Sequence, residues 1–163
     1  ARIAGTTGGL EVGRQAAETL ISYPSANPLL SLYSRAGLAW MAVGLGDRSV
    51  AAELYPYMEP FGISILLGYS GLRLSGLLAH TMGDLDQAAD NFEESLTFCR
   101  EAGYRPELAW TCCDYADTLR ERDAEGDRAK AITLLEESLA ISSELGMRPL
   151  MERVLSRREI LGA

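Results

Sequence analysis

Apolar residues recur at intervals of three and four along most of this 163-residue chain, which is the spacing of one face of an α-helix. Proline and glycine interrupt the pattern at regular distances and mark the helix ends. Together they predict eight helices, at about residues 10–22, 28–45, 47–60, 64–82, 84–102, 106–122, 127–145 and 149–161. No convincing strand is predicted, and the β-branched run at 62–68 is interpreted as the entrance to the fourth helix.

A Gly-Asp pair stands between two of these helices at three places, with spacings of 37 and 43 residues. Glycine can adopt the left-handed conformation that ends a helix, and aspartate can cap the next one. Alanine follows five residues after each Gly, and a bulky apolar residue comes four residues later. The turns and their Ala and bulky positions are Gly46, Ala51 and Tyr55; Gly83, Ala88 and Phe92; and Gly126, Ala131 and Leu135.

The recurrence predicts a stack of similar helix pairs, because one pair alone cannot bury its apolar face. We therefore expect an all-α fold, a right-handed α-solenoid that occupies residues 1–163 as a single domain. Its units are a truncated first repeat at 10–27, repeats at 28–65, 66–105 and 106–148, and a capping helix at 149–161. About three extra residues precede Gly126, and they leave the helix register of the third repeat open.

These landmarks resemble the tetratricopeptide repeat, a helix pair of about 34 residues. The second unit matches best, and the resemblance covers about residues 28 to 149. Its matching positions are Gly76, Ala79, Gly83, Ala88, Phe92 and Pro106. The units of 37 to 43 residues are longer than the family's repeat, and the first lacks a matching terminal proline.

The tail at 144–163 resembles the C-terminal end of helical-repeat regions in large bacterial signalling proteins. Such proteins carry an ATPase module and a cyclase or DNA-binding domain ahead of the repeats. The resemblance implies that this chain is the regulatory or sensor arm of a larger bacterial signalling or transcription-regulating protein.

The formal net charge of −8 argues against nucleic acid as a direct partner, since phosphate binding needs a surplus of Lys and Arg on one face. The basic residues near the C-terminus are interpreted as the solvated side of the last helix; they are Arg148, Arg153, Arg157 and Arg158. No apolar run approaches the length of a membrane span, and no secretory leader is apparent. Three cysteines, two of them adjacent, suit a reducing cytoplasm better than a disulfide framework.

Little in the sequence suggests catalysis. His80 is the single histidine, which excludes two-histidine zinc sites within this chain and leaves a pH-sensing role or an ordinary groove residue. The glycine-rich stretch at 5–14 lacks the Gly-Lys-Ser/Thr ending of a phosphate loop, and Cys112-Cys113 lacks metal-ligand spacing. We therefore predict a protein that is not an enzyme and has no metal or cofactor.

The first helix of each pair is expected to line a concave groove that binds a protein or peptide. The predicted groove residues are Tyr33, Trp40, Arg73, Leu77, His80, Trp110, Asp117 and Arg120, with Ala36, Val43, Ser70 and Cys113 beside them. Aromatic residues and arginine dominate binding hot spots, and grooves of this kind hold extended or helical peptides. The alternative interpretation is that Trp40 and Trp110 only fill gaps between repeats.

Two further functions stay open at this stage. The terminal helices could pair two copies as a homodimer, through Leu10, Val12, Ala16, Ala17 and Leu20 at one end and Leu150, Val154, Leu155 and Leu161 at the other. A small-molecule effector in the groove is the second. The sequence does not rank that ligand against a peptide.

Overall fold

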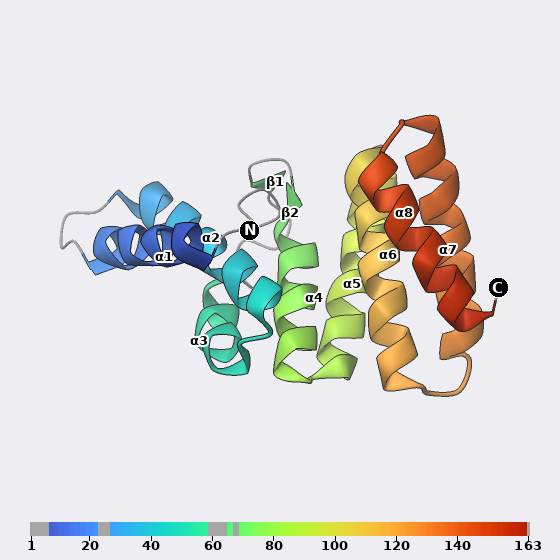
Figure 1. The fold of residues 1–163 in the computed structure, drawn as a ribbon, viewed down its shortest axis with the longest axis horizontal. Helices are drawn as coiled ribbons and strands as arrows, with labels where there is room; N and C mark the ends of the chain where they lie inside the picture. Colours follow the sequence, from blue (N-terminus) through green and yellow to red (C-terminus); the bar gives the residue numbers. More distant parts are fainter. Residues whose placement is uncertain (1–6, 23–26, 59–64, 67–68, 163) are drawn as a thin grey trace.

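The computed structural model describes residues 7–22, 27–58, 65–66 and 69–162. Within these ranges the chain forms eight helices and one pair of two-residue strands (Figure 1). The helices are α1 Thr7–Ser22, α2 Pro28–Leu45, α3 Arg48–Met58, α4 Gly71–Met82, α5 Leu85–Glu101, α6 Arg105–Arg122, α7 Asp127–Glu144 and α8 Arg148–Leu161. The all-α repeat fold predicted from the periodicity is confirmed.

The helices form two rows. Each helix packs on the next one in sequence, and α2, α4, α6 and α8 also contact one another in series. We call these four helices the inner row, and α1, α3, α5 and α7 the outer row. In Figure 1 the pairs follow one another across the molecule, from α1 and α2 at one end to α7 and α8 at the other. Side chains on the inner row therefore come from sequence positions about one repeat apart.

The Gly-Asp turns at Gly46 and Gly83 have the geometry predicted for them, whereas the one at Gly126 does not, because Gly126 precedes α7 and does not end α6. Gly46 and Gly83 end α2 and α4 in the left-handed conformation, with φ of 66° and 89°. The carboxylate of Asp84 accepts a hydrogen bond from the backbone of Gln87 at 3.2 Å and caps α5. In the third unit, Asp123 ends α6 with φ of 52°, so it takes the place that Gly46 and Gly83 hold. The extra residues of the third repeat come after Asp123. The helix register of α6 therefore matches that of α2 and α4 up to Asp123.

The predicted start of the fourth helix is wrong. That helix, α4, begins at Gly71, and the described residues before it form strands β1 Ile65–Leu66 and β2 Tyr69–Ser70, which pair antiparallel. One physical reason is tertiary: the backbone N–H of Ser70 donates to the buried carboxylate of Glu107 at 2.7 Å, which holds this segment against α6. Periodicity along the chain carries no signal for such a contact.

The buried apolar residues form two clusters. One extends from Ala17 through α2 and α3 to Leu74 and Leu78, and the other extends from Ala79 to Leu161. Among the described residues, α4 is the one helix with buried members in both clusters. No helix in the described ranges has the length and apolarity needed to cross a bilayer.

Candidate functional site

Arg73, on inner-row helix α4, lies at the centre of a buried ionic network. Its Nε donates to Asp114 at 2.7 Å, and its Nη1 donates to both carboxylate oxygens of Glu107 at 3.1 Å. Burial by itself would lower the pKa of Arg73, but the two carboxylates of α6 outweigh it and raise that pKa. The guanidinium is therefore charged and fixed, with 2% of the side chain exposed.

Two tryptophans flank this guanidinium. Its central carbon lies 5.2 Å from the ring centroid of Trp40 on α2 and 5.6 Å from that of Trp110 on α6. Trp110 also receives the guanidinium of Arg153 on α8, at 6.0 Å. Distances up to about 6 Å place a cation within reach of the negative face of an aromatic ring. Tryptophan and arginine therefore alternate along the inner row, one from each successive helix.

The network continues outward towards solvent. Asp114 pairs with Arg153 at 2.7 Å, Arg153 pairs with Asp117 at 2.9 Å, and Asp117 accepts from Arg157 at 2.7 Å. Arg120 lies 4.0 Å from the same Asp117. These pairs connect α4, α6 and α8 with alternating charges, and Arg153, Asp117 and Arg157 are partly exposed, whereas Arg73, Glu107 and Asp114 are buried.

His80 forms a second link between α4 and α6. Its Nδ1 is 3.0 Å from the hydroxyl of Thr118, and its Nε2 is 3.3 Å from a carboxylate oxygen of Glu121. The ring is partly exposed, so it is accessible from the surface of the inner row. Leu77, one turn earlier on α4, is also half-buried.

The eight predicted groove residues differ in their exposure to solvent. Tyr33, Trp40, Leu77, His80, Trp110 and Asp117 are half-buried on inner-row helices, and Arg120 is exposed. Arg73 is fully buried, so its predicted place on an open groove surface is wrong. Ala36, Ser70 and Cys113 are buried as well.

Sequence reasoning missed Glu107 and Asp114, and its placement of Arg153 on the solvated side of the last helix is wrong, because that half-buried side chain pairs with buried Asp114 at 2.7 Å. A signal for the burial of Arg73 was present, because Ala36 and Cys113 hold the equivalent place in the neighbouring inner helices. Each lies ten residues before the left-handed residue that ends its helix, as Arg73 does. Small or apolar residues at two of three equivalent positions indicate an interior position.

The terminal helices expose fewer apolar residues than predicted. Val12, Ala16, Leu20 and Leu155 are exposed, whereas Ala17 is buried against α2 and the side chain of Leu10 lies outside the described residues. On α8, Leu150, Val154 and Leu161 are buried. The apolar surface predicted for a homodimer is therefore reduced to one residue of the set on α8 and three on α1.

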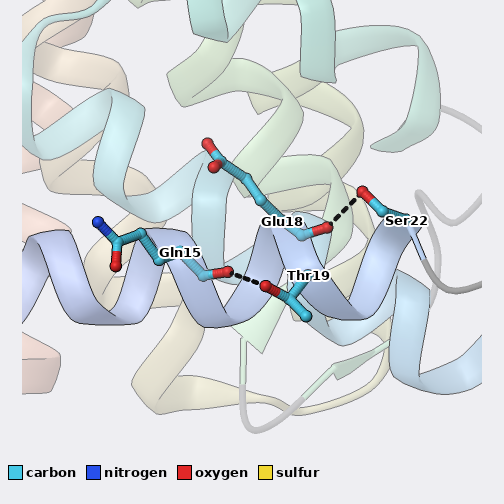
Figure 2. Close-up of a pocket in the computed structure, with 4 residues that line it drawn as sticks. All are labelled: Gln15, Glu18, Thr19 and Ser22. Carbon is cyan, nitrogen blue, oxygen red and sulfur yellow. Dashed lines mark hydrogen bonds between the residues drawn. The ribbon is translucent and has the colours of Figure 1, made fainter.

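An open surface depression of about 580 Å³ lies along α1, lined by Gln15, Glu18, Thr19 and Ser22 (Figure 2). The hydroxyls of Thr19 and Ser22 donate to backbone carbonyls of their own helix at 2.8 Å. Over the described residues, no group of His, Cys, Asp and Glu side chains could hold a metal ion. Burial raises the pKa of the Cys112 and Cys113 thiols, the latter to about 12, which makes both poor nucleophiles.

Comparison with known protein families matches residues 70–144 to a tetratricopeptide-repeat model. The matched region comprises α4 to α7, the two best-patterned pairs, and lies within the 28–149 range suggested by the sequence landmarks. No curated protein and no solved structure gave a match to this chain. Repeats of this family generally mediate protein–protein interaction and are typically non-catalytic.

Proposed function

We propose that this chain, whose residues 70–144 form a tetratricopeptide-like helical repeat, is a non-enzymatic scaffold that binds a protein or peptide along its inner row. Occupancy of that row by a ligand alters the docking of the helices on one another, and small changes add along the stack.

One observation carries the proposal: the half-buried rings of Trp40 and Trp110 both contact the buried, charged guanidinium of Arg73. Ion pairs with Glu107 and Asp114 fix the guanidinium of Arg73. Its cation–π contacts in turn hold both rings in fixed positions. Rigid aromatic side chains lose little conformational entropy when a partner covers them, which favours them as binding anchors. Leu77 and His80 extend the same half-buried surface along α4.

The charges of the inner row suit a partner that contributes apolar contacts. Glu107, Asp114 and Asp117 offset Arg73, Arg153 and Arg157 within the chain itself. The buried end of this network is closed to a ligand, so a partner reaches the half-buried tryptophans rather than Arg73. A small-molecule effector that binds at the same tryptophans is the alternative ligand.

We place this scaffold in the cytoplasm, as the regulatory or sensor arm of a larger bacterial signalling or transcription-regulating protein. The resemblance of the tail at 144–163 supports the larger context. The cytoplasmic assignment is supported by three free, buried cysteines. A homodimer through the terminal helices is the second candidate, and the exposed Val12, Leu20 and Leu155 favour it. Light scattering over a range of concentrations separates a monomeric scaffold from this dimer.

Site-specific photo-crosslinking in cells tests the inner row as the binding surface. A benzophenone amino acid replaces Arg120 on the inner row, and in a matched variant it replaces Glu136 on the outer row; both side chains are exposed. We expect a discrete crosslinked protein from the position 120 variant, and loss of that product when Trp110→Ala is added. Crosslinks that form equally from position 136, or that persist in Trp110→Ala, would overturn the proposal.

A further inference from the structure

Polar contacts join inner-row helices α4 and α6 near both ends of α4. Close to the start of that helix, Arg73 donates to two carboxylates of α6. In its last turn, His80 lies 3.0 Å from the Thr118 hydroxyl and 3.3 Å from a carboxylate oxygen of Glu121. Seven residues separate Arg73 from His80, so the two contacts are about 10 Å apart along the helix axis.

The two contacts differ in how they respond to pH. A guanidinium stays charged over the whole physiological range, so the contact at Arg73 is present throughout that range. Histidine in model peptides changes its charge at about pH 6.5. Of the two contacts, the one at His80 is therefore the one that a moderate change of pH can alter.

The hydrogen bonds around His80 are complete only when its ring carries two protons. The Thr118 hydroxyl donates its single proton to the backbone carbonyl of Asp114 at 3.3 Å, so it accepts a hydrogen bond from Nδ1. Nε2 faces the carboxylate of Glu121, which also accepts. A neutral ring has one N–H, and it therefore gives up one of these three bonds.

Charged groups of both signs act on this end of α4. Glu121 of α6 is in direct contact with the ring and attracts its protonated form. Arg48 of α3 donates to the carbonyl of Met82 in the same last turn, and its charge repels that form. Because Glu121 is the charge in contact, it determines what protonation does to the link between α4 and α6.

Other charged residues on the helices around α4 have their own partners. Asp84 caps α5, and Asp86 pairs with an arginine of α6. Arg35, the charged residue of α2, lies over an aromatic ring of α3. On α6, Asp117 accepts from two arginines of α8 and lies 4.0 Å from Arg120.

We propose that His80, Thr118 and Glu121 form a pH-dependent latch between the C-terminal ends of α4 and α6. In mild acid the doubly protonated ring bonds to Thr118 and Glu121 together and holds the two ends against each other. As the pH rises through the range in which histidine loses its charge, the contact with Glu121 weakens and the ends separate more readily. The contact at Arg73 persists and acts as the pivot.

The position of His80 extends the effect beyond these two helices. His80 lies three residues before the left-handed end of α4, as Val43 and Arg120 do in α2 and α6, so the latch is on the inner row itself. Within the described ranges, α4 alone has buried residues in both apolar clusters, so a shift of its C-terminal end affects both. The latch needs no ligand, and the inference is independent of the proposed function.

A double-mutant cycle tests the latch in the whole chain. Urea unfolding is measured for the wild type, His80→Ala, Glu121→Gln and the double variant at about pH 5.5 and about pH 8, on either side of the range in which histidine titrates. The two side chains are 27% and 56% exposed, so all four proteins should fold. We expect a coupling of about two- to fivefold in the folding equilibrium constant at the lower pH.

At the higher pH that coupling should fall to nearly nothing, because a latch that depends on a protonated ring contributes in acid and is lost as the pH rises. Glu136→Gln, at an exposed glutamate of outer-row helix α7, is the matched control. Combined with His80→Ala, it should show no coupling at either pH. A coupling between His80 and Glu121 that is equal at both pH values, or absent at both, would overturn the proposal.

Amide hydrogen exchange locates the effect. After correction for the pH dependence of intrinsic exchange, the last turns of α4 and α6 should be better protected in the wild type at the lower pH than at the higher. The difference should disappear in His80→Ala and in Glu121→Gln, and the first turn of α6, beside Arg73, should not change. Protection of the last turns that varies with pH in all three proteins, or in none, would also contradict the latch.

Discussion

The guanidinium of Arg48 occupies the space where a side chain on residue 83 would begin, and Gly83 leaves that space open. From there, Arg48 Nε and Nη2 donate to the carbonyl of Met82 at 3.1 and 2.8 Å. The turn glycine of one repeat thus admits an arginine of the preceding repeat, which caps the C-terminal end of α4. Glycine is therefore required at position 83 for two reasons. The backbone there is left-handed, and a Cβ would clash with the Arg48 guanidinium.

Gly83→Ala should therefore destabilise the protein more than Gly46→Ala does. Both residues have positive φ, so alanine costs about 1 to 2 kcal/mol at either position. Nothing lies within 4 Å of a Cβ at Gly46, whereas alanine at position 83 also displaces Arg48 from the Met82 carbonyl, for about 1 kcal/mol more. Urea unfolding measures both. In an Arg48→Ala background the two costs should become equal, and a persistent difference would contradict this explanation.

The helical glycines Gly76 and Gly37 should respond in opposite directions to alanine. At Gly76 the new methyl meets the Phe92 ring at 2.9 Å, and overpacking of this kind costs about 1 to 3 kcal/mol. At Gly37 nothing lies within 4 Å, so alanine should stabilise α2 by about 0.5 to 1 kcal/mol. Thermal unfolding of the two variants gives the comparison. Adding Phe92→Leu should rescue part of the loss at position 76 only.

Arg73→Ala should unfold the protein more readily rather than only weaken ligand binding. The change leaves Glu107 and Asp114 buried without their cation, a loss of about 3 to 5 kcal/mol in comparable pairs. Arg157→Ala, on a partly exposed side chain of the same network, should cost about 1 kcal/mol or less. Chemical denaturation of both variants checks the ranking, and equal losses would show that burial does not govern this network.

Asp127 should contribute stability that disappears in acid. Hydrogen bonds from Arg122, at 2.7 and 2.9 Å, hold the pKa of this carboxyl below its ordinary value of 3.8. A carboxylate with a lowered folded-state pKa stabilises fully above its unfolded pKa, and the contribution is lost as pH falls below about 4. Asp127→Asn should cost about 1 to 3 kcal/mol at pH 7 and progressively less as the pH falls below about 4. A cost independent of pH would assign the effect to packing.

The sequence predicts the helices well because the turn chemistry is local. Gly-Asp pairs, Arg-Pro starts and the Ala-to-bulky spacing act over a few residues, so they are visible without any tertiary contact. The capping arginines were also visible, since Gly-Asp-Arg occurs at 46–48 and at 126–128. Arg128 donates to the carbonyl of Leu161 at 2.6 Å, just as Arg48 does to that of Met82.

The candidate site was predictable only in outline. Periodicity placed Trp40, Arg73 and Trp110 on one row of helices. It did not show whether a charged side chain on that row is exposed to solvent or buried in the interior. The difference depends on Glu107 and Asp114, which are 34 and 41 residues away from Arg73 in the chain. The segment before Gly71 escaped prediction for a similar reason, because Glu107 also holds the backbone of Ser70.

The apolar core is divided into two clusters that share α4, and this division affects the order in which the helices unfold. Residues from Ala17 to Met58 pack in one cluster and those from Ala88 to Leu161 in the other. Heat or a mechanical pull on the N-terminal end can therefore open α1 to α3 while the C-terminal cluster stays packed. Amide hydrogens should then exchange in two classes, with α4 at the boundary, so the protein has a built-in order of unfolding.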